Sequence, residues 1–281
     1  MRLNRLLFLS AALALCFRFV ATSSANPFFF VILGDRTGEP QSRVYEQVWT
    51  ELAAEKPAFV LSVGDTIQGL QDASAADEWQ QVEKIFDRHP SLPVYLAPGN
   101  HDIWSPLSER LFRKFARRAP HYSFDFQNLH VTVLDNSRTE QLSAAELEFL
   151  EQDLQAHERQ PAKLVVCHRP SWLFPVLFKN PNSPLHQLAK RFGVRYLVAG
   201  HLHEMLHFEL EGITYLSMPS AGGHLRASGR YEDGWFFGHT LVEDDNGTLK
   251  FRIEEAKAPI GEGRITSEAD WGAAGLVYRA R

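Results

Sequence analysis

The feature that most constrains the fold is a series of five short, almost continuously apolar runs, each followed closely by polar side chains. Runs this short and this apolar are typical of strands that are buried on both faces. The sequence therefore predicts an α/β protein in which the loops after the strands carry aspartate, asparagine and histidine side chains. The runs cover residues 28–33, 59–63, 94–97, 164–166 and 196–199, and they lead to Gly34-Asp35, Gly64-Asp65, Asn100-His101-Asp102, Cys167-His168 and Gly200-His201-Leu202-His203.

Helix-compatible segments separate the early runs and one later pair. They cover residues 43–56, 75–89 and 143–158, and the last begins with Ser143 followed three residues later by Glu146, the pattern of a capping box. Alternation of strand and helix predicts a largely parallel sheet with helical crossovers. Residues 122–134 and 205–253 instead contain short alternating runs with glycine-bearing turns, which predict antiparallel hairpins in a second sheet packed on the first.

The two ends of the chain differ from the rest. Arginines precede an apolar stretch over residues 6–17, and small residues follow it up to Ala25. This pattern is typical of a secretory signal peptide, so we expect residues 1–25 to be removed and the protein to be exported to the periplasm or the extracellular space. A retained membrane anchor is the alternative, but the stretch is shorter than the roughly 20 residues of a stable membrane span. Residues 26–256 are predicted as one catalytic domain, and 257–281 as a C-terminal extension.

Charge and cysteine content exclude some classes of protein. The formal net charge is −5, and loss of the three arginines in residues 1–25 would make it −8 (−5 − 3), so binding to a nucleic-acid scaffold is not expected. The two cysteines are Cys16 and Cys167, and removal of the first would leave no pair for an intrachain disulfide or a cysteine-based zinc module. The oligomeric state is not indicated.

The polar residues after the five runs are of the kinds that bind metal. In an open α/β sheet, ligands bind beyond the carboxyl ends of the strands, where these loops would meet. Carboxylate, amide and imidazole groups together suit zinc, manganese or iron, and they are too many for one tetrahedral ion. Each motif alone has a simpler interpretation, because Gly-Asp is commonly a turn and Asn-His-Asp can cap a helix. Their occurrence after five successive strands favours two adjacent ions.

With these motifs in this order, the sequence resembles the calcineurin-like metallophosphoesterase family. The family's blocks are Asp-x-His, Gly-Asp, Gly-Asn-His-Asp/Glu, a histidine after a strand, and Gly-His-x-His. The resemblance extends over about residues 28 to 240, and Gly99-Asn100-His101-Asp102 with Gly200-His201-Leu202-His203 is its most specific part. It implies a four-layered α/β/β/α sandwich, two mixed sheets flanked by helices.

The resemblance also implies roles for individual residues, carried over by position. Asp35 and His203 would bind one metal ion, Asn100, His168 and His201 the other, and Asp65 both. His101 would be the general acid for the leaving group, and Asp102 would orient it. The implied activity is hydrolysis of small phosphate mono- or diesters by a hydroxide that bridges two divalent or trivalent ions (manganese, iron or zinc).

One position departs from the family pattern. Thr37 stands where the family usually has a histidine, and its hydroxyl is a weaker ligand, so we expect weaker binding at the first metal site. Gln68 and Arg36 are nearby candidates to compensate or to contact phosphate. The apolar segment 172–184 is expected to be irregular, either a wall of the substrate site or a packed loop. The basic segment 110–118 is expected to be a solvated helix face, with a face toward an anionic substrate or membrane as the alternative. His224 is a weak candidate for contact with the site.

Other functions fit the sequence less well. A Gly-x-Ser-x-Gly elbow, a Gly-x-Gly-x-x-Gly loop and a Walker-type loop are all absent from the sequence, which disfavours a serine hydrolase and a nucleotide-binding module. The main alternative is a non-catalytic binding protein with the phosphoesterase fold and a weakened first metal site. Retention of His101 and His203 argues against that alternative, and metal-dependent turnover distinguishes the two.

Overall fold

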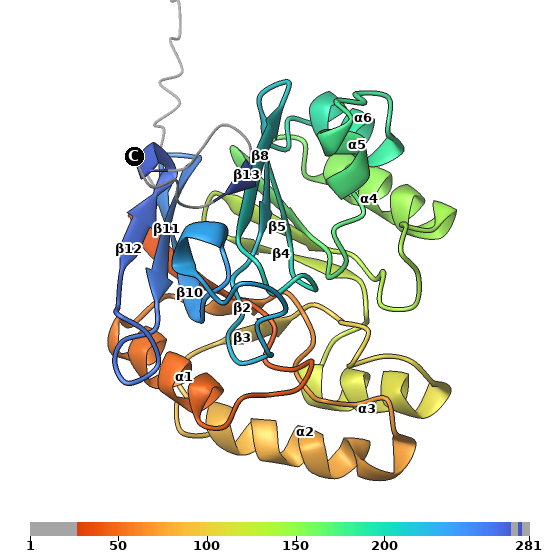
Figure 1. Ribbon diagram of the computed structural model, residues 1–281. Helices are drawn as coiled ribbons and strands as arrows, with labels where there is room; N and C mark the ends of the chain where they lie inside the picture. The colour runs from red at the N-terminus through yellow and green to blue at the C-terminus, as the bar shows by residue number, and fades with distance from the viewer. Residues whose placement is uncertain (1–26, 271–274, 277–281) are drawn as a thin grey trace, which may run out of the picture.

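The computed structural model describes residues 27–270 and 275–276, which form two mixed β-sheets packed face to face with helices on their outer faces (Figure 1). The predicted signal peptide, residues 1–25, lies outside the described residues. Among the described residues, no helix is both long and apolar enough to span a membrane.

The first sheet has six strands in the order β12-β11-β10-β1-β2-β3. Strands β1, β2 and β3 are parallel, whereas β10, β11 and β12 extend the sheet beyond β1 by antiparallel pairing. The strands are β1 (Phe28–Leu33), β2 (Val60–Ser62), β3 (Val94–Leu96), β10 (Gly238–Asp245), β11 (Thr248–Glu255) and β12 (Ile265–Ser267).

The second sheet has seven strands in the order β13-β8-β9-β7-β6-β5-β4. Its centre, β9-β7-β6-β5, is parallel, and antiparallel pairs complete both edges. The strands are β4 (Tyr122–Phe126), β5 (Leu129–Val133), β6 (Ala162–Val166), β7 (Tyr196–Ala199), β8 (Leu206–Leu210), β9 (Ile213–Ser217) and β13 (Gly275–Leu276).

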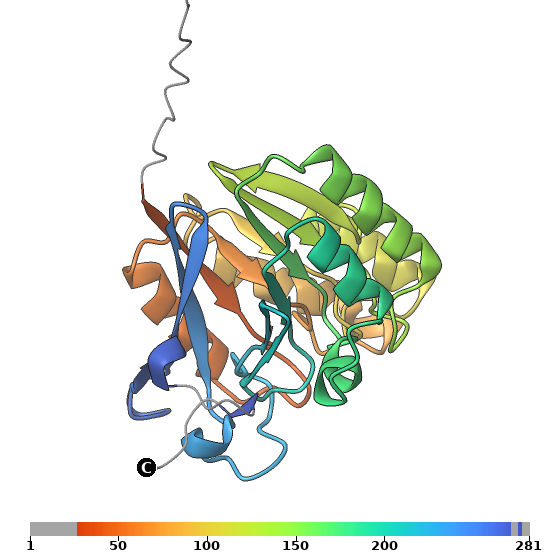
Figure 2. The same cartoon turned by 90° about the horizontal axis from the view of Figure 1, so that it is seen from above.

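The helices cover the two outer faces of this pair of sheets. Figures 1 and 2 show α1 to α3 on the side of the first sheet and α4 to α6 on the side of the second. The α-helices are α1 (Val44–Ala54), α2 (Asp72–Phe86), α3 (Pro106–Ala116), α4 (Ala144–Ala156), α5 (Leu173–Leu177) and α6 (Pro184–Arg191), and two short 3₁₀ turns lie at Tyr231–Asp233 and Glu268–Asp270. The predicted α/β/β/α sandwich is confirmed.

Strand β1 contributes side chains to two apolar cores, one on each of its faces. Phe28, Phe30 and Ile32 point into the apolar core between the two sheets, and the alternate residues Val31 and Leu33 pack beneath α1. Side chains of a strand alternate between its faces, so a continuously apolar strand can serve two cores at once. The apolar runs therefore mark strands that have a layer on each side.

The hairpins are distributed differently from the prediction. The five apolar runs were expected in one largely parallel sheet, with the hairpins in a second. Instead β6 and β7 belong to the second sheet, while the β10–β11 hairpin joins the first sheet by pairing β10 antiparallel to β1. The physical reason is that a strand's pairing partner depends on the path of long connections, which local pattern does not encode.

Two local predictions also compare directly with the structure. Ser143 caps α4, because its side chain accepts a hydrogen bond from the backbone N–H of Glu146 at 3.2 Å, so the predicted helix start is confirmed. The segment 172–184 was expected to be irregular, and this was wrong, since it contains α5. Trp172 and Val176 anchor that helix in the core, whereas Phe174 and Phe178 stack on each other at the surface.

Candidate metal centre

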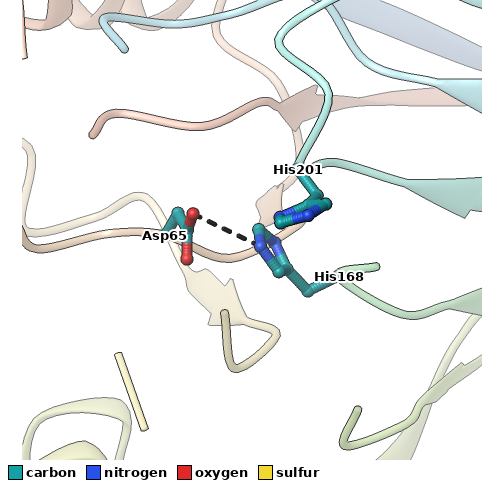
Figure 3. A group of neighbouring side chains, drawn as sticks. All are labelled: Asp65, His168 and His201. Atoms are coloured by element: carbon teal, nitrogen blue, oxygen red, sulfur yellow. Dashed lines mark ion pairs between the residues drawn. The ribbon is translucent and has the colours of Figure 1, made fainter. Parts of the chain in front are cut away.

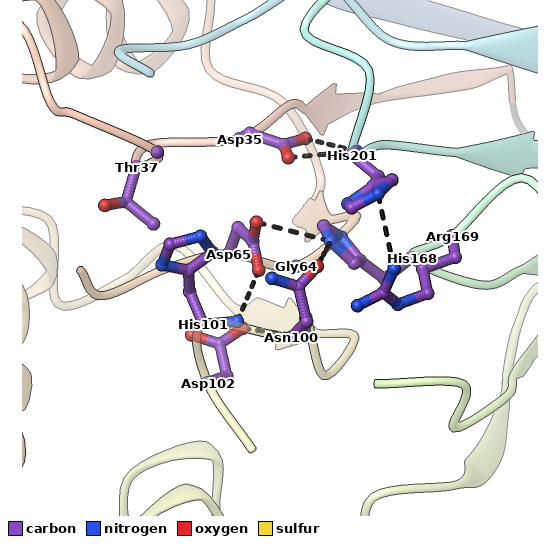
Figure 4. Close-up of polar contacts among 12 residues, drawn as sticks. Asp35, Thr37, Gly64, Asp65, Asn100, His101, Asp102, His168, Arg169 and His201 are labelled. Carbon is purple, nitrogen blue, oxygen red and sulfur yellow. Dashed lines mark hydrogen bonds and ion pairs between the residues drawn. The ribbon is translucent and has the colours of Figure 1, made fainter. Parts of the chain in front are cut away.

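The polar residues that follow the strands of both sheets meet at one place between the sheets. Asp35, Asp65 and the segment 100–102 follow β1, β2 and β3 of the first sheet, and His168 and the pair His201 and His203 follow β6 and β7 of the second. Figure 4 shows most of these side chains facing one another across the seam. The carboxyl ends of the parallel strands of each sheet thus supply one half of a shared site.

One half of the centre consists of Asp65, His168 and His201 (Figure 3). One ligand atom from each of these residues lies within 4.8 Å of the others. His168 Nε2 lies 3.3 Å from Asp65 Oδ2 and 3.1 Å from Asn100 Oδ1. Asn100 therefore joins the same cluster, as its position after β3 predicted.

The other half consists of Asp35, Asp65 and His203, whose ligand atoms also lie within 4.8 Å of one another. His203 Nε2 is 3.3 Å from Asp35 Oδ2, and both side chains are fully buried. Asp65 belongs to both groups, so a single carboxylate stands between two sets of ligands. This arrangement fits two adjacent cations that share one carboxylate.

Unpartnered polar atoms support the fit to metal. Asp65 Oδ2, His201 Nδ1 and His203 Nε2 are buried, yet none has a hydrogen-bond partner within the described part of the chain. A buried donor or acceptor without a partner costs about 1–3 kcal/mol, so native proteins rarely keep one without a reason. Three such atoms, all on side chains of ligand type, indicate that the site is built to bind cations.

The histidines are also oriented as metal ligands usually are. His168 Nδ1 donates to the carbonyl of Val63 at 2.9 Å, and His203 Nδ1 donates to the carbonyl of His224 at 2.7 Å. Each of these hydrogen bonds fixes the tautomer and turns Nε2 toward the carboxylates. Neither acceptor could be identified from the sequence, because both are backbone carbonyl groups.

Charge coupling at the centre shifts several pKa values. Burial alone would lower the pKa of His168, but the neighbouring Asp65 carboxylate outweighs it and raises that pKa to about 9. Burial would likewise raise the pKa of Asp65, and the charge of His168 instead holds it well below its usual range. Burial, together with the charge of His168, lowers the pKa of His201 to about 4. Without metal, Asp65 is therefore a carboxylate paired with a protonated His168, and His201 is a neutral imidazole, so metal binding at His168 would release its proton.

The backbone is strained where it presents these ligands. Asp65, His201 and His203 have φ angles of 54°, 70° and 60°, in the left-handed region that residues other than glycine seldom adopt. Gly99 and Gly200 lie against the carboxylates of Asp65 and Asp35, so closely that a Cβ at either position would collide with them. The Gly-Asn-His-Asp and Gly-His-x-His motifs thus need glycine because backbone passes directly behind a ligand.

His101 and Asp102 are held by different partners. The His101 ring donates from Nδ1 to the carbonyl of Gln68 at 2.5 Å, which leaves Nε2 as its reactive nitrogen. Asp102 instead accepts backbone N–H groups of Thr66, Ile67 and Gly99 at 2.8, 3.2 and 2.9 Å. Burial, with a smaller contribution from Asp65, raises the pKa of Asp102 to about 7. Asp102 therefore ties together the loops that follow β2 and β3, and the carbonyl of Gln68 orients the His101 ring.

Gln68 holds the loop that contains Thr37 through hydrogen bonds. Thr37 is fully buried, and its hydroxyl donates to Gln68 Oε1, which also accepts the backbone N–H of Glu39 at 3.2 Å. Two arginines lie nearby: Arg36 donates to the carbonyl of Thr66 at 3.2 Å, and Arg169 NH1 is 3.4 Å from His201 Nε2. Arg169 was not among the predicted site residues, although its place directly after His168 was a usable signal.

A known protein family and curated relatives match most of this chain. The model of the family described as calcineurin-like phosphoesterase matches residues 30–205, more than half of the chain. The 3′,5′-cyclic adenosine monophosphate phosphodiesterase CpdA of Haemophilus influenzae is 24% identical over 187 residues, which are 63% of this chain and 66% of that protein. The chain thus spans slightly less than two thirds of this relative.

Solved structures agree on the fold. The purple acid phosphatase PPD1 from yellow lupin (Lupinus luteus) seeds has a TM-score of 0.63 and 15% identity, and the likeness covers 86% of this chain and 53% of that one. GAP50, the anchor in the inner membrane complex of Plasmodium, has a TM-score of 0.58 and 14% identity, with 91% and 90% covered. At these identities the likeness establishes the arrangement of sheets and helices alone.

Proposed function

The chain belongs to the calcineurin-like phosphoesterase family, whose members are metal-dependent hydrolases of phosphate esters, and from this premise we propose that it is a dinuclear phosphodiesterase. The observation that carries the proposal is the position of Asp65 between two groups of ligands, Asp35 with His203 and His168 with His201. A phosphodiester substrate is supported by the relative from Haemophilus influenzae, which is named a 3′,5′-cyclic adenosine monophosphate phosphodiesterase.

The chain's own residues divide the work between binding and proton transfer. Asp35, Asp65 and His203 would hold one ion, and Asp65, Asn100, His168 and His201 the other. When bound, manganese, iron or zinc ions supply the Lewis acidity that activates water and neutralises the oxygens of the phosphate. The Thr37 hydroxyl is hydrogen-bonded to Gln68 and is not free to bind metal. The ion beside Asp35 would therefore have fewer protein ligands and be the more weakly held of the two.

His101 is the residue proposed to transfer a proton. Its Nδ1 is fixed by the carbonyl of Gln68, and its backbone N–H donates to Asp65 Oδ1 at 2.9 Å, so the ring sits beside the shared ligand. From there Nε2 would give its proton to the leaving alkoxide, a step typically worth about 10²–10⁴-fold in rate. Arg36, which donates to the carbonyl of Thr66, and Arg169, whose NH1 lies 3.4 Å from His201 Nε2, would contact the phosphate oxygens that carry negative charge.

We also propose that the protein acts after export. The support comes from the sequence alone, namely the signal-peptide pattern in residues 1–25. Expression of the full chain followed by mass analysis of the secreted product would test this, and a product that still begins at Met1 would contradict it.

The experiment that tests the function compares hydrolysis of three esters: p-nitrophenyl phosphate, bis-p-nitrophenyl phosphate and 3′,5′-cyclic AMP. The purified protein is stripped of metal and resupplied with manganese, zinc or iron, and His101→Ala is assayed beside it under the same conditions. We expect metal-dependent turnover that favours the diesters. Turnover of the monoester alone would show that the protein is a phosphatase and not a phosphodiesterase. Metal binding without turnover would support a non-catalytic binding protein.

A further inference from the structure

A second group of metal-ligand side chains lies where α1 meets the outer hairpin of the first sheet. Glu55 follows the last residue of α1, and His239 on β10 is the direct cross-strand neighbour of Glu254 on β11. One ligand atom from each of these three residues lies within 4.8 Å of the others. Figure 1 shows α1 on the side of the sheet that carries β10 to β12. The group shares no residue with the centre described above.

His239 is the observation that points to a ligand. The residue is 1% exposed, and neither Nδ1 nor Nε2 has a hydrogen-bond partner anywhere in residues 27–270 or 275–276. Its Nε2 lies 3.9 Å from Glu254 Oε2 and 4.0 Å from Glu55 Oε1, too far for hydrogen bonds. A cation at the middle of these three atoms would satisfy the imidazole and both carboxylate oxygens.

Arg252 arranges the two carboxylates. It donates from Nε to Glu254 Oε1 at 2.7 Å, and its NH2 lies 3.5 Å from Glu55 Oε2. Each glutamate thus places one oxygen on Arg252 and leaves its other oxygen on the side of His239. Orientation of ligands by a neighbouring hydrogen-bonding group is usual around metal sites.

The protonation states agree with this geometry. Burial lowers the pKa of His239 to about 4, so its imidazole is neutral and able to bind metal. Burial and the neighbouring Glu254 raise the pKa of Glu55 to about 7, because two negative charges this close repel each other, and a bound cation would remove that repulsion. The charges that reach the group are those of Arg252 and the exposed Lys257.

We propose that Glu55, His239 and Glu254 form an additional binding site for a borderline divalent ion of the Zn²⁺ type, separate from the catalytic centre. One imidazole and two carboxylates suit zinc, whereas an imidazole ligand is uncommon for calcium or magnesium. Because Glu55 directly follows α1 while His239 and Glu254 lie on β10 and β11, the ion would tie the end of the helix to the hairpin that flanks β1.

The test counts Zn²⁺ ions bound by the purified protein. The protein is stripped with a chelator and dialysed against buffered Zn²⁺, and metal per chain is measured by atomic emission. Glu254→Gln and Glu55→Gln keep side-chain shape and remove one ligand charge, and Glu243→Gln makes the same change at an exposed position of β10 as a matched control. We expect the first two variants to bind one ion fewer per chain than the wild type, and the control to bind the wild-type number.

A second readout follows the stability of the same proteins. Because a bound ion would add a link between Glu55 and the β10–β11 hairpin, Zn²⁺ should raise the melting temperature of the wild type and the control more than that of Glu55→Gln. Equal zinc content and equal zinc-dependent melting shifts in the wild type and both ligand variants would overturn the site. If Glu254→Gln fails to fold, the partly exposed Glu55→Gln variant still decides the question.

Discussion

Two clusters of aspartate and histidine in this molecule contain the same kinds of side chain and differ in whether their polar atoms have hydrogen-bond partners. At the metal centre, Asp65, His201 and His203 each keep a buried ligand atom without a hydrogen-bond partner in the described structure. Beside α4, His130 bonds to Asp125 at 2.7 Å through Nδ1 and to Asp153 at 2.9 Å through Nε2, so both of its ring nitrogens are used.

In the second cluster the carboxylate also has hydrogen-bond partners. Asp153 also accepts hydrogen bonds from the hydroxyls of Ser123 and Thr132, each at 2.6 Å, and the His157 ring stacks on His130. Ligand atoms of Asp125, His130 and His157 come within 4.8 Å of one another, as at the metal centre. Composition and proximity therefore do not distinguish a metal site from a structural network. The distinguishing feature is whether the ligand atoms already have partners.

The largest effect that would sharpen this contrast is expected for Asp65→Asn. The change removes the carboxylate that both ligand groups share, and metal stabilisation of the transition state is worth several kcal/mol, so kcat should fall by at least about 10³-fold. The metal-free variant should also lose unfolding free energy, because Asp65 pairs with His168 at 3.3 Å and accepts the backbone N–H of His101 at 2.9 Å, so turnover is compared only in samples that urea unfolding shows to be folded. A variant that keeps near-normal turnover would show that the centre is not the site of hydrolysis.

The next effect concerns His101, whose side chain is not proposed to bind metal. His101→Ala should lower kcat by about 10²–10⁴-fold while the number of bound metal ions stays the same. Steady-state kinetics and metal analysis on one preparation would measure both. Loss of a bound ion along with activity would instead make His101 a ligand or a support for one. Substrates with a better leaving group should suffer less from the change, because they need less proton donation.

A third substitution tests the other cluster with the opposite expected outcome. Asp153→Asn places an amide where the Asp153 carboxylate accepts hydrogen bonds from three side chains, and loss of one partner of a buried pair should cost about 3 kcal/mol of unfolding free energy. The kcat of the folded variant should remain within about twofold of the wild-type value, because the cluster takes no part in hydrolysis. A twofold change is well below the tenfold change in rate that 1.36 kcal/mol of activation free energy produces. Unfolding in urea and turnover would be measured together.

The matched control is Asp125→Asn, which makes the same change on the exposed side of His130. The Asp125 side chain is 43% exposed, so the loss should be about 1 kcal/mol or less. Equal losses in the two variants would contradict the role given to burial in this cluster.

The smallest effect is on pH dependence, and it has a definite sign. Burial alone would lower the pKa of His130, but its hydrogen bonds with Asp153 and Asp125 outweigh burial and raise it. The stabilisation from protonated His130 is therefore fully present below the unfolded pKa of about 6.5 and is lost as pH rises through the higher folded value. The difference in unfolding free energy between wild type and His130→Gln should be larger at pH 6 than at pH 9. A difference that grows with pH would contradict the assignment.

The fold was predictable as far as local pattern determines it. Strands 28–33 and 196–199 have the expected bounds, since each is a continuous apolar run that ends at a glycine. Helix α2 begins at Asp72, before the expected residue 75, because its N-cap residue Gln71 provides no side-chain cap that the sequence could reveal. The division of the strands between two sheets depends on long-range pairing, such as β10 with β1, and no short segment encodes it.

The residues of the metal centre were predictable for a related reason. Side chains that follow buried strands must gather at one edge of the sheets, so the pattern that gave the strands also gave Asp35, Asp65 and His168. The backbone carbonyls of Val63, His224 and Gln68 orient the histidines, and a carbonyl has no signature in the sequence. For the same reason the partners of Asp102 could only be seen in the structure, since all three are backbone N–H groups.

The position of Asp65 between the two ligand groups has a thermodynamic consequence. A carboxylate shared by two sites makes their occupancies interdependent: an ion in one group changes the charge and geometry that the other group offers. By linkage, the factor by which the first ion alters affinity for the second must equal the factor in the reverse direction. The order in which the two ions enter therefore cannot alter the total free energy of loading, and a substitution that weakens one group, as at Asp35, must be felt by reciprocity in the apparent affinity of the other.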